Sequence, residues 1–283
     1  MAALSHTYRY RFPSALHTET DRPSLTLATS SAATDEPHPF FFHGLVREPR
    51  ITSDLLVALS DVVGAHYFRP LDWRQLDPVV TSNEEMLRFE GFSGCCGVYA
   101  RIDLPASAFE SDGIQGRGTT NVDFNQPMRA SLMQTGTSDS MSLGVGADRV
   151  EIERSGHGVI ERKVQLPMRW IKGFSEVQAF QPGLQRRFEI AGADARRFLR
   201  SLPFKNPPKQ ASYVVSAGRG LRLSPRASKG AVAVHGVHRL QTLVPLTTRA
   251  QRLVLWADHD RGTSAWQVEF SHGCYTLLMS PEV

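Results

Sequence analysis

Residues 87–104 read LRFEGFSGCCGVYARIDL, two runs of alternating residues on either side of a short glycine-containing segment. In the first run Leu87 and Phe89 alternate with charged residues, and the second run repeats the pattern from Val98 to Ile102. Alternation with a period of two is typical of a strand that buries one face. The glycines of SGCCG suit the turn of a hairpin. The stretch therefore predicts two adjacent antiparallel strands.

The charged residues of this hairpin are Arg88, Glu90, Arg101 and Asp103. The two carboxylates could serve acid–base catalysis, which would require them to be held together with their pKa values pushed apart. Because each of them alternates with an arginine on neighbouring strands, cross-strand ion pairs are the prediction.

Helical periodicity before this hairpin predicts a helix over residues 52–67, with Ser53 as its cap and one apolar stripe. The prolines of residues 68–81 predict a loop. Further on, Pro127 suits the first turn of a short helix, with Met128, Leu132 and Met133 facing inward. Residues 141–166 then read as three antiparallel strands, with a turn at SGHG.

We divide the chain into a mobile arm (1–36), a first α+β domain (37–181) and a second α+β domain (182–283). In the second domain a helix near residues 193–202 precedes seven strand candidates, of which RLQTLVPL (239–246) is one. Both domains run from a helix into hairpin-linked strands. The fold class is therefore α+β, with mainly antiparallel sheets each backed by a helix and two similar subdomains. Such a repeat would be consistent with a sliding-clamp-like subunit.

The formal net charge of +4 is unevenly distributed. Residues 1–150 carry 12 Arg and no Lys against 18 acids, a net of −6, and residues 151–283 carry 20 Lys and Arg against 10 acids, a net of +10. A basic second half favours an acidic partner, with nucleic acid the leading candidate. The alternative is that the two halves neutralise each other.

Arginine forks match phosphate oxygens, and an indole can stack on an unpaired base. The alternative for RWIKGF is a packed Trp170 with solvated basic neighbours. The predicted nucleic-acid-binding residues are Arg162, Lys163, Arg169, Trp170, Lys172, Arg186, Arg187, Arg196, Arg197, Arg200, Arg219 and Arg222.

The three cysteines are too few for a disulfide scaffold. We expect Cys95 and Cys96 to be buried thiols on a tight turn, with a reactive pair as the alternative. The possible metal ligands His235, His238, His259, His272 and Cys274 are scattered, so no metal or cofactor is predicted. No nucleotide-binding or hydrolase motif is present, and we expect no enzymatic activity.

Several blocks together resemble the amino-terminal region of bacterial SWIM zinc finger family proteins. These are DPVVT (77–81), residues 87–104, GTTNVDFNQPMRASL (118–132), ERKVQLPMRWIKGFSEVQA (161–179), RRFLRSLP (196–203), AGRGLRLSPR (217–226) and LLMSPEV (277–283). The resemblance implies a non-enzymatic binding or scaffold role, with a MoxR-type ATPase and von Willebrand A-type proteins as partners. The family's CxC…CxH finger is absent, so the chain is either part of a longer protein or a finger-less relative, and no metal is carried over.

No apolar run approaches the roughly eighteen residues that cross a bilayer, and the amino terminus lacks an apolar export segment. We expect a cytoplasmic protein without membrane contact. The leading functional prediction is a DNA-binding module that acts through the basic second half. The alternative is a protein–protein adaptor or sliding-clamp-like assembly subunit with no nucleic-acid contact.

Overall fold

The computed structural model describes residues 40–65, 78–83, 85–110, 114–122, 124–164, 168–208 and 210–281. It also gives the backbone of two short paired strands, β1 (Ala15–His17) and β2 (Ser24–Thr26). The rest of the predicted arm (1–36) lies outside the described residues. None of the described helices is both long and apolar enough to cross a bilayer.

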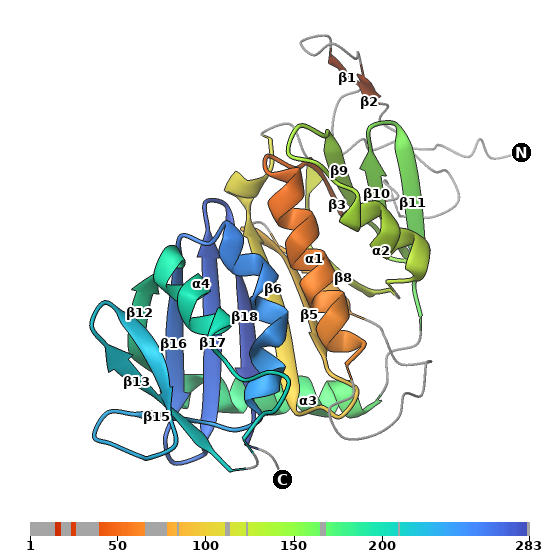
Figure 1. Ribbon diagram of the computed structural model, residues 1–283. Coiled ribbons are helices and arrows are strands. Elements are labelled where there is room, and N and C mark those ends of the chain that lie inside the picture. The colour runs from red at the N-terminus through yellow and green to blue at the C-terminus, as the bar shows by residue number, and fades with distance from the viewer. Residues whose placement is uncertain are drawn as a thin grey trace, which may run out of the picture.

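The first half of the described chain alternates single helices with groups of strands (Figure 1). Its elements are β3 (Phe42–Leu45), α1 (Pro49–Val63), β4 (Val79–Ser82), β5 (Met86–Phe92), β6 (Val98–Pro105), η1 (Ala106–Ala108), β7 (Ile114–Gln115), β8 (Gly118–Asn121), α2 (Gln126–Met133), β9 (Met141–Val145), β10 (Arg149–Arg154) and β11 (His157–Arg162).

The connection to the second half is α3 (Met168–Phe180) followed by η2 (Gln181–Gly183). The second half comprises β12 (Gln185–Ala191), α4 (Gly192–Arg200), β13 (Ser212–Ala217), β14 (Gly220–Ser224), β15 (Val232–Val234), η3 (Val237–Leu243), η4 (Pro245–Thr248), β16 (Arg252–Asp258), β17 (Thr263–Phe270) and β18 (Gly273–Met279).

Three larger sheets hold these strands, and every pairing between named strands is antiparallel. Their strand orders are β11-β10-β9-β3-β7, β12-β16-β17-β18-β6-β5-β4-β8 and β14-β13-β15. The eight-stranded sheet joins the two halves, because β18 pairs with β6 from Cys274 opposite Asp103 to Met279 opposite Val98. The predicted α+β class with antiparallel sheets is confirmed.

The two halves repeat the same arrangement. In the first half β3 pairs with β9, and β9, β10 and β11 follow as a meander, while in the second half β12 pairs with β16 and β16, β17 and β18 follow. Likewise β4 pairs with β5 and β8, and β13 pairs with β14 and β15. The short helices η3 and η4 take the place of α2. The expectation of two similar subdomains is confirmed.

The predicted hairpin forms as β5 and β6, with Arg88 opposite Asp103 and Glu90 opposite Arg101. Both arginines converge on Asp103, Arg88 through Nε at 2.6 Å and Arg101 through Nε at 2.8 Å. Glu90 accepts a hydrogen bond from the hydroxyl of Tyr99 at 2.5 Å. The charged residues therefore have a structural role at this sheet, as expected.

Register places the helices on opposite faces of the eight-stranded sheet. Tyr275 lies opposite Ile102 and donates its hydroxyl proton to the carbonyl of Ala58 in α1, so these residues face α1. Tyr99 is an odd number of positions from Ile102 and therefore points to the other face, where it contacts Phe174 of α3. Figure 1 shows α1 and α4 on one side of the strands and α3 on the other.

Two expectations about helices are corrected. The first helix begins at Pro49, a residue suited to an opening turn, and Ser53 is a buried helical residue whose Oγ donates to Sδ of Met141 rather than a cap. It ends at Val63, and the predicted end at Tyr67 lies outside the described residues. Met133 is exposed instead of inward, because α2 ends there.

Two predicted elements have a different structure. Residues 79–81, expected in a loop, form β4, because pairing with β5 and β8 outweighs the neighbouring prolines. RLQTLVPL, expected as a strand, forms η3 and η4. Leu240, Leu243 and Leu246 are three residues apart, which places them on one side of a 3₁₀ helix, and all three are buried.

Candidate functional site

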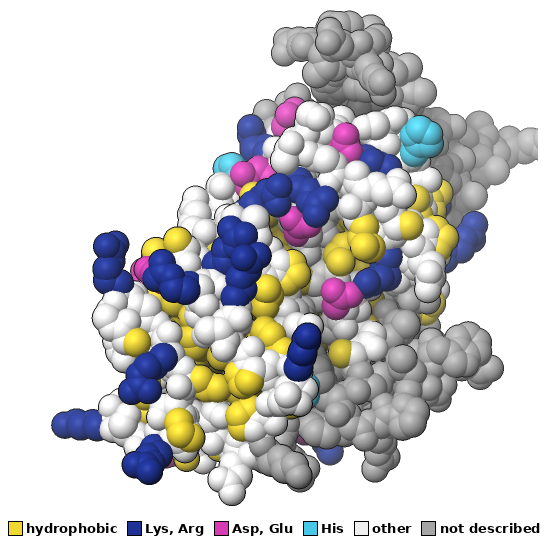
Figure 2. Space-filling model, viewed as in Figure 1, with side chains coloured by type: hydrophobic (Ala, Val, Ile, Leu, Met, Phe, Trp, Pro, Cys, Tyr) yellow, Lys and Arg dark blue, Asp and Glu magenta, His cyan; other side chains and the backbone are white. Residues whose placement is uncertain are grey.

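The face covered by α1, α2, α4, η3 and η4 carries most of its charge as arginine. Figure 2 shows Lys and Arg side chains spread across this face, with fewer acidic ones among them. Arg50 bridges to Asp54 at 2.8 Å and Arg129 to Asp61 at 2.7 Å. Apart from the buried Arg239 of η3, the arginines in these helical elements and at the end of η4 are Arg50, Arg129, Arg196, Arg197, Arg200 and Arg249. The ion-pair partners among them are Asp54, Asp61 and Asp194.

The helix α4 presents its arginines to solvent because its other face is packed. Ala195, Phe198 and Leu199 are buried, and the Phe198 ring stacks on that of Trp266 at 6.1 Å between centroids. Arg197 is held by Asp194 at 2.9 Å, whereas Arg200 is exposed in the last turn. Cations at a helix carboxyl end are favoured by its dipole. Three of the predicted nucleic-acid-binding residues thus share this helix.

A second basic region surrounds the β13–β14 hairpin. Arg219 and Arg222 are exposed there, and Arg226 and Lys229 follow in the next loop. No acidic residue occurs between Asp194 and Asp258, a span that holds 12 Lys and Arg. Leu223 and Pro225 help to line an open pocket of about 420 Å³, together with Pro208, Gln210, Ala211, Ser212 and Ser224.

The strand β11 forms one edge of the five-stranded sheet. It ends in Arg162, with Lys163 next in the chain, and both side chains are exposed. Ile160 is 54% exposed on this strand, and Met133 is 61% exposed on α2, which packs against β11. Ile160 and Met133 are the two large apolar side chains that are exposed in the described part of the chain. Sequence reasoning had singled out the charges of this edge and missed its apolar component.

The remaining predicted binding residues lie elsewhere. Lys172 is exposed on α3, and Arg169 and Trp170 belong to the same helix, although their side chains lie outside the described residues. On β12, Arg186 is paired with Glu189 at 2.7 Å, and Arg187 lies 3.2 Å from His259. Because α3 and α4 cover opposite faces of the sheet, the predicted residues on these two helices do not share one surface.

The face beneath α3 contains two titratable groups in contact, Glu90 and Tyr99. Phe174 of α3 contacts Phe92 and Tyr99 at ring distances of 5.0 and 6.3 Å. Burial raises the pKa of Glu90, although the hydrogen bond from Tyr99 acts to lower it. Burial and the neighbouring Glu90 also raise the pKa of Tyr99. The pair is thus a largely buried hydrogen bond covered by α3.

The cysteines correct another expectation. Cys96 is exposed at a left-handed position of the hairpin turn (φ 57°), and Cys95 is only partly buried beside Ser93, so the pair does not behave as core thiols. Burial raises the pKa of Cys274, which makes this thiol less reactive. Among the described residues, no three His, Cys, Asp or Glu side chains come together as a metal site would need.

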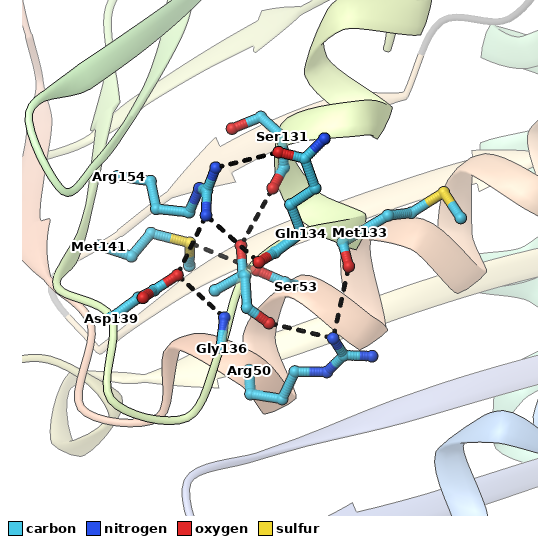
Figure 3. A network of polar contacts seen from close by, with 10 residues as sticks. Arg50, Ser53, Ser131, Met133, Gln134, Gly136, Asp139, Met141 and Arg154 are labelled. Carbon is cyan, nitrogen blue, oxygen red and sulfur yellow. Dashed lines mark hydrogen bonds and ion pairs between the residues drawn. The ribbon is translucent and has the colours of Figure 1, made fainter.

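Polar contacts tie the end of α2 to Arg50 of α1 and Arg154 of β10 (Figure 3). Arg50 donates to the carbonyl of Thr135 at 3.0 Å, and Arg154 donates to that of Gln134 at 3.2 Å. These carbonyls follow the end of α2, where backbone acceptors lack helical partners. Arg154 is itself held by Asp139 at 3.1 Å. The network orients α2 with the Met133 side chain toward solvent.

The repeat, the shared central sheet and the helices on one face can be compared with solved structures. The crystal structure of proliferating cellular nuclear antigen from Entamoeba histolytica matches with a TM-score of 0.58 at 9% identity, over 86% of this chain and 100% of that one. A PCNA2–PCNA3 complex from Sulfolobus tokodaii gives 0.61 at 10% identity, over 85% and 99%. The fold is that of the PCNA-like sliding clamps.

The clamp-like fold agrees better with the predicted alternative, an assembly subunit, than with the DNA-binding module. No family model and no curated protein matches the chain. The resemblance to SWIM zinc finger proteins therefore stays a prediction.

Proposed function

We propose that this protein is a non-enzymatic subunit of a clamp-like assembly and that it joins its neighbour through the edge strand β11. The observation that carries the proposal is the joint between β18 and β6 inside the chain. In the internal repeat β11 is the counterpart of β18. Yet in the described part of the chain β11 pairs only with β10 along its length.

The chemistry of this edge supports an interaction. An unpaired strand offers a row of backbone donors and acceptors to another chain, and proteins usually blunt such edges with charge. Here Ile160 is exposed in the middle of the strand, and Met133 is exposed on α2, which packs against β11. One of the similar structures is itself a complex between two PCNA chains, which is consistent with an assembling subunit.

The test is the size of the assembly that contains the protein in the cells that produce it. We expect the tagged full chain to elute from size exclusion of a native extract well above its own mass of 31.4 kDa. The change Ile160→Lys places a charge on the edge strand and should return the protein to the monomer position. Its melting temperature should stay unchanged, because the side chain is 54% exposed.

Ser107→Lys is the matched control, since it adds the same charge at an exposed position in η1, next to β6 rather than β11. It should leave the assembly intact. Elution of the wild-type chain as a monomer, or an Ile160→Lys variant that assembles normally, would contradict the proposal.

A second candidate function is nucleic-acid binding by the helical face. The observation that favours it is the excess of arginine on this face, where Arg200 is exposed and six arginines accompany three aspartates. Phosphate contacts of this kind are strongly salt-dependent. The SWIM-type scaffold role, the MoxR-type and von Willebrand A-type partners and the cytoplasmic location likewise stay proposals.

A further inference from the structure

We infer that the chain assembles with a different kind of subunit and not with a second copy of itself. The inference rests on the proposed assembly function and names the chemistry of the partner. It comes from a difference between the two halves of the chain, which otherwise repeat each other.

The second half lacks a strand in the place of β6. In the first half β5 leads into β6, which receives β18. In the second half β14, the counterpart of β5, leads through residues 225–231 directly to β15. β15 pairs with β13 as β8 pairs with β4, so it is the counterpart of β8. Residues 210–281 are all described, and among them no strand stands beyond β14.

Without that strand, a second copy cannot reproduce the joint inside the chain. The joint combines strand pairing with helix contacts, because the hydroxyls of Tyr275 and Thr242 both donate to the carbonyl of Ala58 in α1. If β11 of one copy paired with β14 of another, it would lie one strand closer to β13 than β18 lies to β4, the counterpart of β13, inside the chain. In the repeat, α4 is the counterpart of α1, and α2 is the counterpart of η3 and η4. Neighbouring strands are about 4.8 Å apart, so α2 of one copy and α4 of the other would be displaced by that distance from the positions in which α1 and η3 make contact inside the chain.

Charge also opposes pairing between copies. The open edge of β14 is flanked by Arg222, Arg226 and Lys229, with no acid in residues 195–257. β11 ends in Arg162 and continues to Lys163. Like charges opposite each other on paired strands are destabilising. On the neighbouring strand β10, Glu151 bridges to Arg149 and Glu153 is exposed, which offsets part of this charge.

The partner that fits has two recognisable features. For β11 it supplies an acceptor strand in the position of β6. For β14 it supplies an extended strand with acidic side chains, which adds to the open edge through main-chain hydrogen bonds. The pocket beside Leu223 and Pro225 would accept an apolar side chain of that strand. A subunit with these edges is chemically distinct from this chain.

The first test is the mass of the purified full chain, measured by light scattering from low to high micromolar concentration. The expected result is a monomer of 31.4 kDa throughout. A larger species that is dissociated both by Ile160→Lys and by Arg222→Glu would be a β11–β14 contact between copies. That result would overturn the inference while leaving the proposed assembly function standing.

The second test identifies the neighbour at each edge inside the cell. A photo-reactive benzoylphenylalanine replaces Ile160 or Arg222, both exposed, and Ser107 serves as the control position. We expect adducts at positions 160 and 222 with chains other than this one, and none of them at 107. Adducts between two copies of this chain would overturn the inference alone. If neither position 160 nor position 222 forms an adduct, the result would contradict both the inference and the proposed function.

Discussion

Arg239 donates a hydrogen bond from Nη1 to the backbone carbonyl of Gly97, at 3.0 Å across 142 positions of sequence. Its Nη2 donates to the carbonyls of His235 at 2.7 Å and Ser280 at 2.9 Å. The side chain is 1% exposed, so the guanidinium is a buried tie between the tip of the β5–β6 hairpin and the second half. The joint between β18 and β6 is thereby closed at one end by Arg239 together with Ser280, whose backbone amide and hydroxyl also donate to the carbonyl of Gly97 at 3.2 Å.

Replacement of this arginine should weaken the joint. Arg239→Met keeps much of the volume but leaves three carbonyls without these donors, at a cost of about 3 kcal/mol of unfolding free energy. Urea unfolding of the purified chain measures this directly. Arg219→Met, at an exposed position of the β13–β14 turn, is the control and should change stability little. Equal stability of the two variants would show that the buried arginine is dispensable.

The start of α4 tolerates only glycine. A Cβ on Gly192 would lie 1.8 Å from the carbonyl oxygen of Ala250, which belongs to the backbone and cannot rotate away. We expect Gly192→Ala to destabilise the protein by about 3 kcal/mol. Gly158→Ala is the matched control, because its Cβ would meet nothing within 4 Å. Thermal unfolding followed by circular dichroism compares the two, and a Gly192→Ala variant as stable as the control would refute the expected clash.

Acid should weaken the contacts around α2. The backbone amide of Gly136 and the guanidinium of Arg154 lower the pKa of Asp139 below its usual value. A carboxyl with a depressed pKa stabilises the folded state above its unfolded pKa and loses this contribution as the pH falls through the folded one. Wild-type stability should therefore fall on acidification through the carboxyl range, and Asp139→Asn should reduce that dependence. Urea midpoints measured from neutral to acidic pH test this, and parallel curves for the two proteins would exclude the contribution.

Charge reversal on α4 separates the two candidate functions. The triple change of Arg196, Arg197 and Arg200 to Glu should abolish retention on DNA if the helical face binds nucleic acid, with wild-type binding that weakens steeply as salt rises. Stability should change little, because the buried face of α4 consists of Ala195, Phe198 and Leu199. Electrophoretic titration with single- and double-stranded DNA measures binding. Unchanged retention by the folded variant would exclude α4 as the contact.

Local pattern was sufficient for the elements whose contacts are local. The alternation around Leu87 and Phe89 predicted β5 and β6 as an antiparallel hairpin, since a hairpin pairs residues close in sequence. The helix predicted near residues 193–202 forms as α4, which buries the apolar Ala195, Phe198 and Leu199. At these positions side-chain polarity alone distinguishes core from solvent.

The amino-acid sequence by itself determined the antiparallel α+β class, the repeat of helix and hairpins and the excess of positive charge after the midpoint. Only the tertiary structure decided that β18 closes on β6, that β11 and β14 are edge strands within the described part of the chain, and that the predicted basic residues divide between two faces. The physical reason is that strand pairing between distant segments depends on backbone hydrogen bonds, which are available to every residue and leave little trace in residue type.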